Sequence, residues 1–186
     1  MRRPPKATKP SQIAPLCIAL SSLASALHAH AEAPMHTDDA GTLTQGAMKL
    51  EGVFGRDDKT RGAELLFGAG IAPQLEMEVS LARAKDTAMG ASTTFHGHGW
   101  GVKWVPIQNE TGWSVGARFD MGHTRVRDHA TPQRFTERET ALTALASYRL
   151  ANAQVLHLNA GHKTVRAQGA RHRAATWAVG YEIPLT

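Results

Sequence analysis

Residues 113–121 read W-S-V-G-A-R-F-D-M and alternate without a break between apolar side chains and small or charged ones. A period of two is that of a β-strand, because successive side chains of a strand point to opposite faces of the sheet. The stretch is nine residues long, which is about the length that a tilted strand needs to cross a bilayer. It therefore predicts a strand with one apolar face and one polar face.

The N-terminal region has the layout of a secretory signal peptide. A basic start with Arg2, Arg3, Lys6 and Lys9 precedes the uncharged, apolar or small residues 13–27, and Ala29-His30-Ala31 matches a small-x-small cleavage site. The apolar part is too short to span a membrane as a helix. We expect residues 1–31 to be a cleaved signal peptide, 32–46 a polar lead-in and 47–186 a single domain. The alternative is an amphipathic N-terminal helix of a cytosolic protein.

Charge and cysteine content exclude two classes of function. The formal net charge of +5 comes from 21 basic and 16 acidic residues. Four of the basic residues lie in the predicted signal peptide, so 17 minus 16 leaves about +1 in the mature chain. We therefore expect no nucleic-acid partner. The single cysteine, Cys17, lies in the same segment, so the mature chain is predicted to have neither a disulfide nor thiolate chemistry.

Seven further segments repeat the alternation, and the spacing between segments alternates as well. Connections after the second, fourth and sixth segments are short, whereas the others are longer and charged, as in outer-membrane barrels with short periplasmic turns and long outer loops. No later apolar run is long enough for a transmembrane helix, and a sheet in lipid has to close on itself. The fold class predicted is all-β: an antiparallel up-and-down transmembrane β-barrel of about eight strands. The expected strands are 47–55, 62–72, 74–82, 97–105, 113–121, 137–150, 154–163 and 173–183.

The alternation assigns side chains to two faces of this barrel. The charged row either selects permeants in an open lumen or fills a narrow barrel as an ion-paired core. The aromatic residues Trp100, Trp113, Trp177, Tyr148 and Tyr181 are candidates for the interfacial girdles. The residues expected to face lipid are Leu75, Met77, Val79, Leu81, Trp100, Val102, Trp104, Trp113, Val115, Phe119, Trp177, Val179 and Tyr181. Those expected to line the lumen are Lys49, Glu51, Glu64, Glu76, Glu78, Lys103, Arg118, Asp120, Glu139, Arg149, His157 and Glu182.

The expected long loops are rich in basic residues, which either bind lipopolysaccharide phosphates or form a solvated surface. Their acidic residues are fewer: Asp57, Asp58, Asp86 and Asp128. The basic residues are Arg56, Lys59, Arg61, Arg83, Lys85, Arg125, Arg127, Arg134, Arg166, Arg171 and Arg173.

Neither a metal site nor a catalytic site is predicted. His96 and His98 lie on one side of an extended segment, but no third ligand accompanies them. Lipid-modifying barrel enzymes need a nucleophile pair of the His-x-Ser kind, and His162-Lys163-Thr164 is a poor match. Ser147, His157 and His162 are the residues to replace in a test for hydrolysis. We expect a protein that is not an enzyme and that uses no cofactor.

Several short stretches resemble proteobacterial outer-membrane barrels described as transporters of the phenol meta-degradation pathway type. The resemblance implies a channel-like barrel for small, hydrophobic compounds and carries no catalytic residues. Members of that family are larger barrels whose chains continue past the turn at 183–186, so this chain is either a closed eight-stranded barrel or a part of a larger one. The stretches are 37–42 (T-D-D-A-G-T), Gly46, 49–51 (K-L-E), 74–78 (Q-L-E-M-E), 101–104 (G-V-K-W) and 180–186 (G-Y-E-I-P-L-T).

These features together predict a transporter- or porin-like barrel in the outer membrane of a Gram-negative bacterium, exported through the Sec pathway. Its expected partners are outer-membrane lipid, lipopolysaccharide, the barrel-assembly machinery and a small permeant. Two alternatives stay open: a structural or lipopolysaccharide-interacting barrel with a plugged lumen, and a periplasmic, lipocalin-like binding barrel. The lipocalin-like barrel would turn its apolar rows inward.

Overall fold

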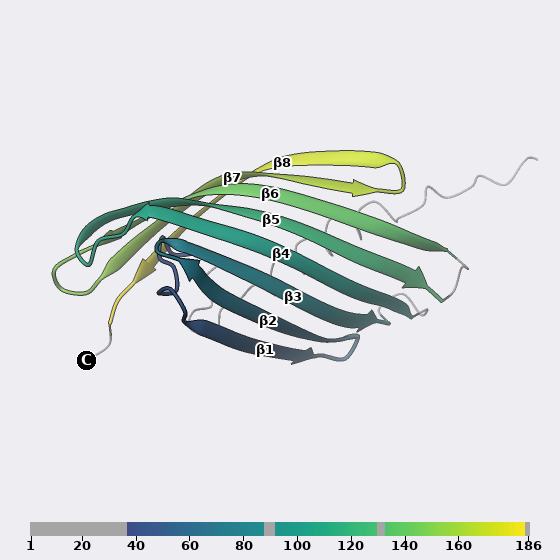
Figure 1. The fold of residues 1–186 in the computed structure, drawn as a ribbon. Helices are drawn as coiled ribbons and strands as arrows, with labels where there is room; N and C mark the ends of the chain where they lie inside the picture. Colours follow the sequence, from purple (N-terminus) through teal and green to yellow (C-terminus); the bar gives the residue numbers. More distant parts are fainter. Residues whose placement is uncertain (1–36, 88–91, 130–132, 185–186) are drawn as a thin grey trace, which may run out of the picture. The chain divides into compact units, whose positions relative to one another are not determined.

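The structure, a computed structural model, describes residues 37–87, 92–129 and 133–184, which build one antiparallel sheet of eight strands in sequence order (Figure 1). Within these residues no helix is long and apolar enough to cross a membrane. The predicted signal peptide lies outside the described residues. The strands are β1 (Met48–Arg56), β2 (Thr60–Ala72), β3 (Leu75–Asp86), β4 (Thr93–Ile107), β5 (Gly112–Asp128), β6 (Arg134–Arg149), β7 (Val155–Ala167) and β8 (Ala170–Glu182).

The predicted up-and-down order of antiparallel strands is confirmed, but the predicted long loops are wrong. Strands β3, β4, β5 and β7 run well into segments that hydropathy assigned to loops, and only 87–92, 129–133 and 168–169 connect the strands at those places. The two-residue alternation continues through these strand ends. On the face that is apolar in the middle of each strand, Arg and His take the place of the apolar residues. The prediction ended each strand where the apolar residues stop, although backbone pairing continues beyond that point.

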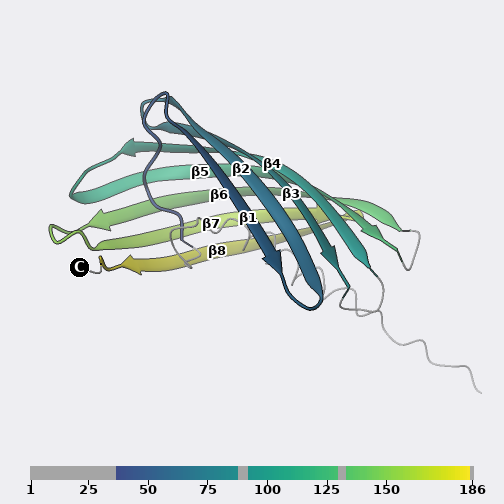
Figure 2. The ribbon, with the colours of Figure 1, turned by 90° about the horizontal axis from the view of Figure 1, so that it is seen from below.

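The sheet is open, with β1 and β8 at its two edges (Figure 2). Each edge strand pairs with a single neighbour, β1 with β2 and β8 with β7. The sequence-based expectation of a closed barrel therefore goes beyond what the described residues form. The ribbon is strongly curved and twisted, as antiparallel sheets of this length are when they pack around one face.

Turn chemistry explains two of the tight connections. Pro73 and Gln74 join β2 to β3, and the positive φ of 65° at Gln74 suits the third position of a turn whose second position is proline. Gln168 and Gly169 join β7 to β8 with φ values of 49° and 81°. Two successive positive φ angles define the two-residue hairpin turn that matches the twist of paired strands.

A segment preceding β1 lies across one face of the sheet; we call residues 37–47 the strap and this face the inner face. Asp38 exchanges two hydrogen bonds with Asn159 on β7, of 2.8 and 2.9 Å. The N–H of Ala40 donates to Ser147 Oγ on β6 at 2.8 Å, and that of Leu43 donates to Glu76 Oε2 on β3 at 2.9 Å. The strap therefore spans the inner face from β7 to β3.

The small apolar core lies under the strap. Ala40 packs with Val105 of β4 and Leu145 of β6, which are 0% and 1% exposed. The strap ends at β2, where the N–H of Gly46 donates to the carbonyl of Gly70 at 2.8 Å and the N–H of Gly70 donates to that of Ala47 at 3.0 Å. A Cβ at Gly70 would overlap the carbonyl oxygens of Leu43 and Thr44. Glycine at this position is therefore required for the strap to dock.

We predict that Gly70→Val releases the end of the strap. The added side chain would collide with the strap backbone, and the expected loss in the free energy of unfolding is about 1–3 kcal/mol. A urea titration measures this loss, and cleavage at Asp38 by an aspartate-specific protease reports strap release. Gly52→Val on β1 is the matched control, because a Cβ there meets nothing within 4 Å. Equal protease resistance in the two variants would contradict the prediction.

Candidate functional site

The inner face carries all the acidic residues of the eight strands together with several basic ones, and many of these charges are buried. Glu76, Glu78 and Lys103 are 2%, 3% and 3% exposed, although charged side chains are rarely buried in proteins. Strand alternation and the pairing register place every predicted lumen-lining residue on this face of the sheet. A charge held away from water needs a partner, so the inner face has to be an ion-pair network.

Arg118, near the middle of β5, is the centre of that network. Its Nε donates to both carboxylate oxygens of Asp120, at 2.9 and 3.1 Å. Its other nitrogens reach Glu78 on β3 and Asp38 of the strap, the latter at 3.2 Å. One guanidinium therefore joins three carboxylates from two strands and the strap, using the several donors that its planar fork provides.

Two lysines complete the network on either side. Lys49 of β1 pairs with Glu78 and with Glu76, the latter at 3.0 Å. Lys103 of β4 donates to Asp38 at 2.8 Å and to Asp39 at 3.2 Å. The sequence interpretation missed both aspartates because it assigned them to a lead-in. The available signal was the pair of adjacent acidic residues itself, which lies shortly before the first strand.

A second polar chain lies under the strap on β6, β7 and β8. Ser147 Oγ and His157 Nδ1 share a hydrogen bond of 2.8 Å, and His157 Nε2 lies 3.2 Å from Glu182 Oε1. The set has the residue types of a serine hydrolase triad. However, the N–H of Ala40 already donates to Ser147 Oγ, and both Ser147 and His157 are buried. The strap thus covers the oxygen that would attack a substrate, and in this arrangement the chain of polar groups anchors the strap.

The remaining predicted inner residues are Glu51, Glu64, Glu139 and Arg149. Glu139 of β6 pairs with Lys163 of β7 at 2.7 Å. Glu51 lies 3.9 Å from Lys49, and Glu64 is buried on β2. Arg149 is exposed at the last position of β6, so it lies on the inner face but outside the buried network.

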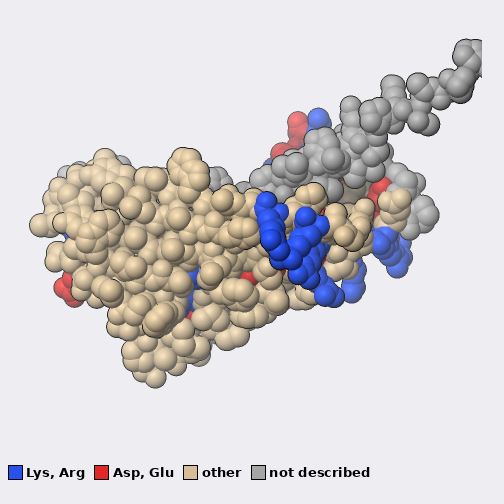
Figure 3. Space-filling view, turned by 90° about the horizontal axis from the view of Figure 1, so that it is seen from above, with Lys and Arg blue, Asp and Glu red and all other residues tan. Residues whose placement is uncertain are grey.

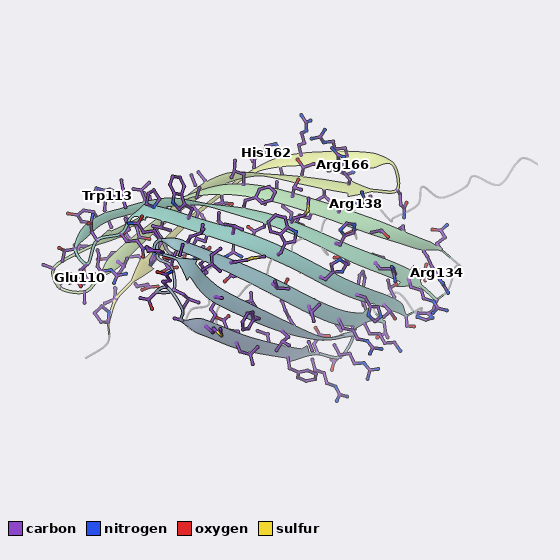
Figure 4. The ribbon with its side chains drawn as sticks, in the orientation of Figure 1. Glu110, Trp113, Arg134, Arg138, His162 and Arg166 are labelled. Carbon is purple, nitrogen blue, oxygen red and sulfur yellow. The ribbon has the colours of Figure 1, made fainter. Side chains whose placement is uncertain are left out.

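The opposite, outer face is exposed and is apolar over much of its area, with basic residues toward one end of the strands. All the residues predicted to face lipid lie on it by strand register, among them Val79 at 43%, Leu81 at 57% and Trp177 at 80% exposure. Trp113 packs against Tyr148 at the end where the chain enters and leaves the sheet, with ring centroids 5.0 Å apart (Figure 4). The usual distribution of a water-soluble fold, with apolar side chains inside and charges outside, is therefore inverted.

The histidine pair considered as a metal site lies on the outer face. His96 and His98 are both exposed on β4, and the ring of His98 stacks on His123 of β5 with centroids 5.4 Å apart. Among the described residues no group of three or more His, Cys, Asp or Glu side chains is placed to hold a metal ion. The structure thus brings two imidazoles together, but without the carboxylate or third imidazole of a metal site.

No family model, curated protein or solved structure matches the chain. The resemblance to the phenol-pathway type of outer-membrane barrel therefore rests on the quoted stretches alone.

We predict that Arg118→Met strongly destabilises the fold. Removing the guanidinium leaves three carboxylates close together on a face shielded from water, and the expected loss in the free energy of unfolding is about 3–5 kcal/mol. Denaturant titration of the folded protein measures it. Arg125→Met on the same strand is the matched control, since Arg125 is exposed on the outer face. Combining Arg118→Met with Glu78→Gln should recover part of the loss. Similar losses for Arg118→Met and Arg125→Met would refute the network.

Proposed function

We propose that this chain forms the wall of an outer-membrane β-barrel and provides a porin-like path for small molecules. The observation that supports the proposal most directly is the inverted distribution of polarity: buried ion pairs on the inner face and exposed Leu, Val, Phe, Met and Trp on the outer face. In lipid the outer rows meet acyl chains, and the charges share a polar interior. The predicted signal peptide is consistent with export to that membrane.

The strap argues for a barrel of more than eight strands. The lumen of an eight-stranded barrel is just wide enough for side chains. Here a stretch of backbone lies over the inner face and is hydrogen-bonded to Asn159, Ser147 and Glu76 in addition to the inward side chains. Room for that backbone requires a wider lumen, and the open edges β1 and β8 are where further strands would pair. The resemblance to larger barrels supports the same conclusion.

In such a barrel the strap forms a constriction. It crosses the inner face with Asp38 and Asp39 held by Lys103, so a permeant would pass a polar, ion-paired ring rather than an open channel. Rings of charged side chains select permeants by sign and size. Polar and small amphiphilic compounds are therefore the expected cargo.

A specific observation supports the alternative of a plugged barrel. If the strap stays docked at all times, the barrel is plugged and serves as a structural or lipid-interacting protein. The buried chain from Ala40 through Ser147 to His157 favours stable docking. The lipocalin-like alternative has less support, because a soluble ligand-binding barrel would place its apolar rows inside, whereas here they are exposed.

We predict a depth-dependent cost of charge on the outer face of β3. Met77→Arg and Val79→Arg should each destabilise the vesicle-inserted protein by about 2–4 kcal/mol, and Leu81→Arg by less, because it lies next to Arg83 at the end of the apolar row. Urea titration in lipid vesicles measures the difference. A soluble protein would tolerate all three exposed substitutions within about 0.5 kcal/mol, so a flat series would overturn the membrane assignment.

We predict that loosening the strap raises conductance. Ser147→Ala combined with Asn159→Ala removes the side chains that hold Asp38 and Ala40, and single-channel conductance in planar bilayers should rise several-fold. Thr124→Ala with Thr93→Ala is the control, because both threonines lie on the inner face toward the end of the strands that is away from the strap. No channels from either the wild type or the loosened variant would exclude a porin-like function and leave the plugged barrel.

A further inference from the structure

The outer face carries basic residues but no acidic one in any of the eight strands. Of the 16 acidic residues, those within strands occupy inner-face positions, as their pairing registers show. The basic residues of this face are confined to one end of the strands, the end that carries the β7–β8 turn. The strap and the last residue of β8 lie at the opposite end. The Lys and Arg residues of the outer face are Arg56, Arg61, Arg83, Lys85, Arg125, Arg127, Arg134, Arg138, Arg166, Arg171 and Arg173.

On β6, β7 and β8 these basic residues form one compact group, which we call the arginine row. Arg138 lies directly opposite Arg166 in the register, and Arg166 lies opposite Arg171. Arg173 lies one step further along the same face, opposite Thr164, and His162 lies two steps further, opposite Ala175. Figure 4 shows Arg138, Arg166 and His162 on neighbouring strands, and Figure 3 shows Lys and Arg gathered at one end of a largely uncharged surface.

Among the residues that the structure describes, the arginine row has no acidic side chain on its own face of the sheet. The acidic residues nearest in sequence, Glu137 and Glu139, point to the inner face, where Glu139 pairs with Lys163. Like charges directly opposite each other on a sheet destabilise it. Three exposed guanidinium groups in register therefore cost stability unless an external anion neutralises them.

We infer that the arginine row binds the phosphate groups of a phosphorylated glycolipid of the lipid A type; this rests on the proposed membrane location. Guanidinium groups bind phosphate oxygens through paired N–H donors, and several of them in a row suit a lipid with more than one phosphate. Further along the same face of these strands, past Thr140, Thr164 and His162, lie Leu142, Ala160, Ala175 and Trp177, which form an apolar surface for acyl chains. The headgroup and chains of one lipid thus meet matching surfaces.

The position of the row favours a lipid of the outer leaflet over one of the inner leaflet. The strap, the start of β1 and the end of β8 share one end of the strands, whereas the row is next to the β7–β8 turn at the other. An exported chain with an even number of strands keeps both ends on the periplasmic side, which places the row at the outer leaflet. Aromatic side chains, including the pair of Trp113 and Tyr148, mark the opposite end.

The test is lipid retention by the purified full chain in detergent micelles, measured by native mass spectrometry. The probes are bisphosphorylated lipid A, its dephosphorylated form and phosphatidylglycerol. The variant combines Arg138→Gln, Arg166→Gln and Arg171→Gln. The matched control combines Arg56→Gln, Lys59→Gln and Arg61→Gln, which removes the same charge at the β1–β2 end, where Asp57 and Asp58 lie between the basic residues.

We expect the wild type to retain lipid A at least tenfold better than either other lipid, the triple variant to lose that preference, and the control to keep it. Equal retention of phosphorylated and dephosphorylated lipid A, or an equal loss in variant and control, would overturn the inference. Equal retention of phosphatidylglycerol would show a general anionic surface and would overturn it as well. Insertion of the wild type into vesicles is scored separately, so failure of the membrane assignment is distinguished from failure of the lipid site.

Discussion

The fold depends on one constraint: charged side chains that the sheet and strap remove from water must be paired there. Arg118, with Glu78, Asp120 and Asp38 around it, satisfies that constraint only in the observed register. A slip of one residue along any strand would turn its charges outward and its apolar row inward. The same network ties the strap to the sheet, because Asp38 is a partner of both Arg118 and Lys103. Strand register, strap position and the division into two faces are thus set by the same few ion pairs.

The alternation of apolar and polar residues is a local property of the sequence. The sequence predicted the structure correctly wherever this alternation determines it. It predicted eight strands and the face on which residues such as Val79 and Glu78 lie. It failed at the strand ends, because Arg125 and Arg127 continue the outer row of β5 while their hydropathy resembles that of a loop. It also failed for the strap, since Asp38 meets Asn159 across 121 positions of sequence. Such contacts follow from the curvature of the folded sheet, which no short pattern encodes.

The outer face is asymmetric along the strands, and the proposed membrane location would give this asymmetry a physical reason. Trp113 and Tyr148 at one end have the mixed apolar and polar character that suits an interface. At the other end the apolar row gives way to Arg and His on strand after strand, at similar positions along the strand. A symmetric bilayer would give no reason for this difference. A membrane with phosphorylated glycolipid in one leaflet and ordinary phospholipid in the other does, because only one interface then has dense negative charge.

The open edges of the sheet and the strap both bear on how the sheet could close. Strands β1 and β8 each leave a row of backbone N–H and C=O groups without a neighbouring strand in the described sheet, and hydrocarbon has no partner for such groups. Pairing β1 with β8 directly would satisfy them but would close a lumen too narrow for the strap backbone. Because the number of strands is even, β1 and β8 run in opposite directions. A further strand that pairs with β8 and runs in the same direction as β1 is therefore antiparallel to β8. Two copies of the chain related by a twofold axis along the strands would pair β8 of each copy with β1 of the other in this antiparallel way. Further hairpins of one polypeptide would pair with both edges in the same way. In the proposed barrel, such a wider closure would accommodate both the strap and the edges.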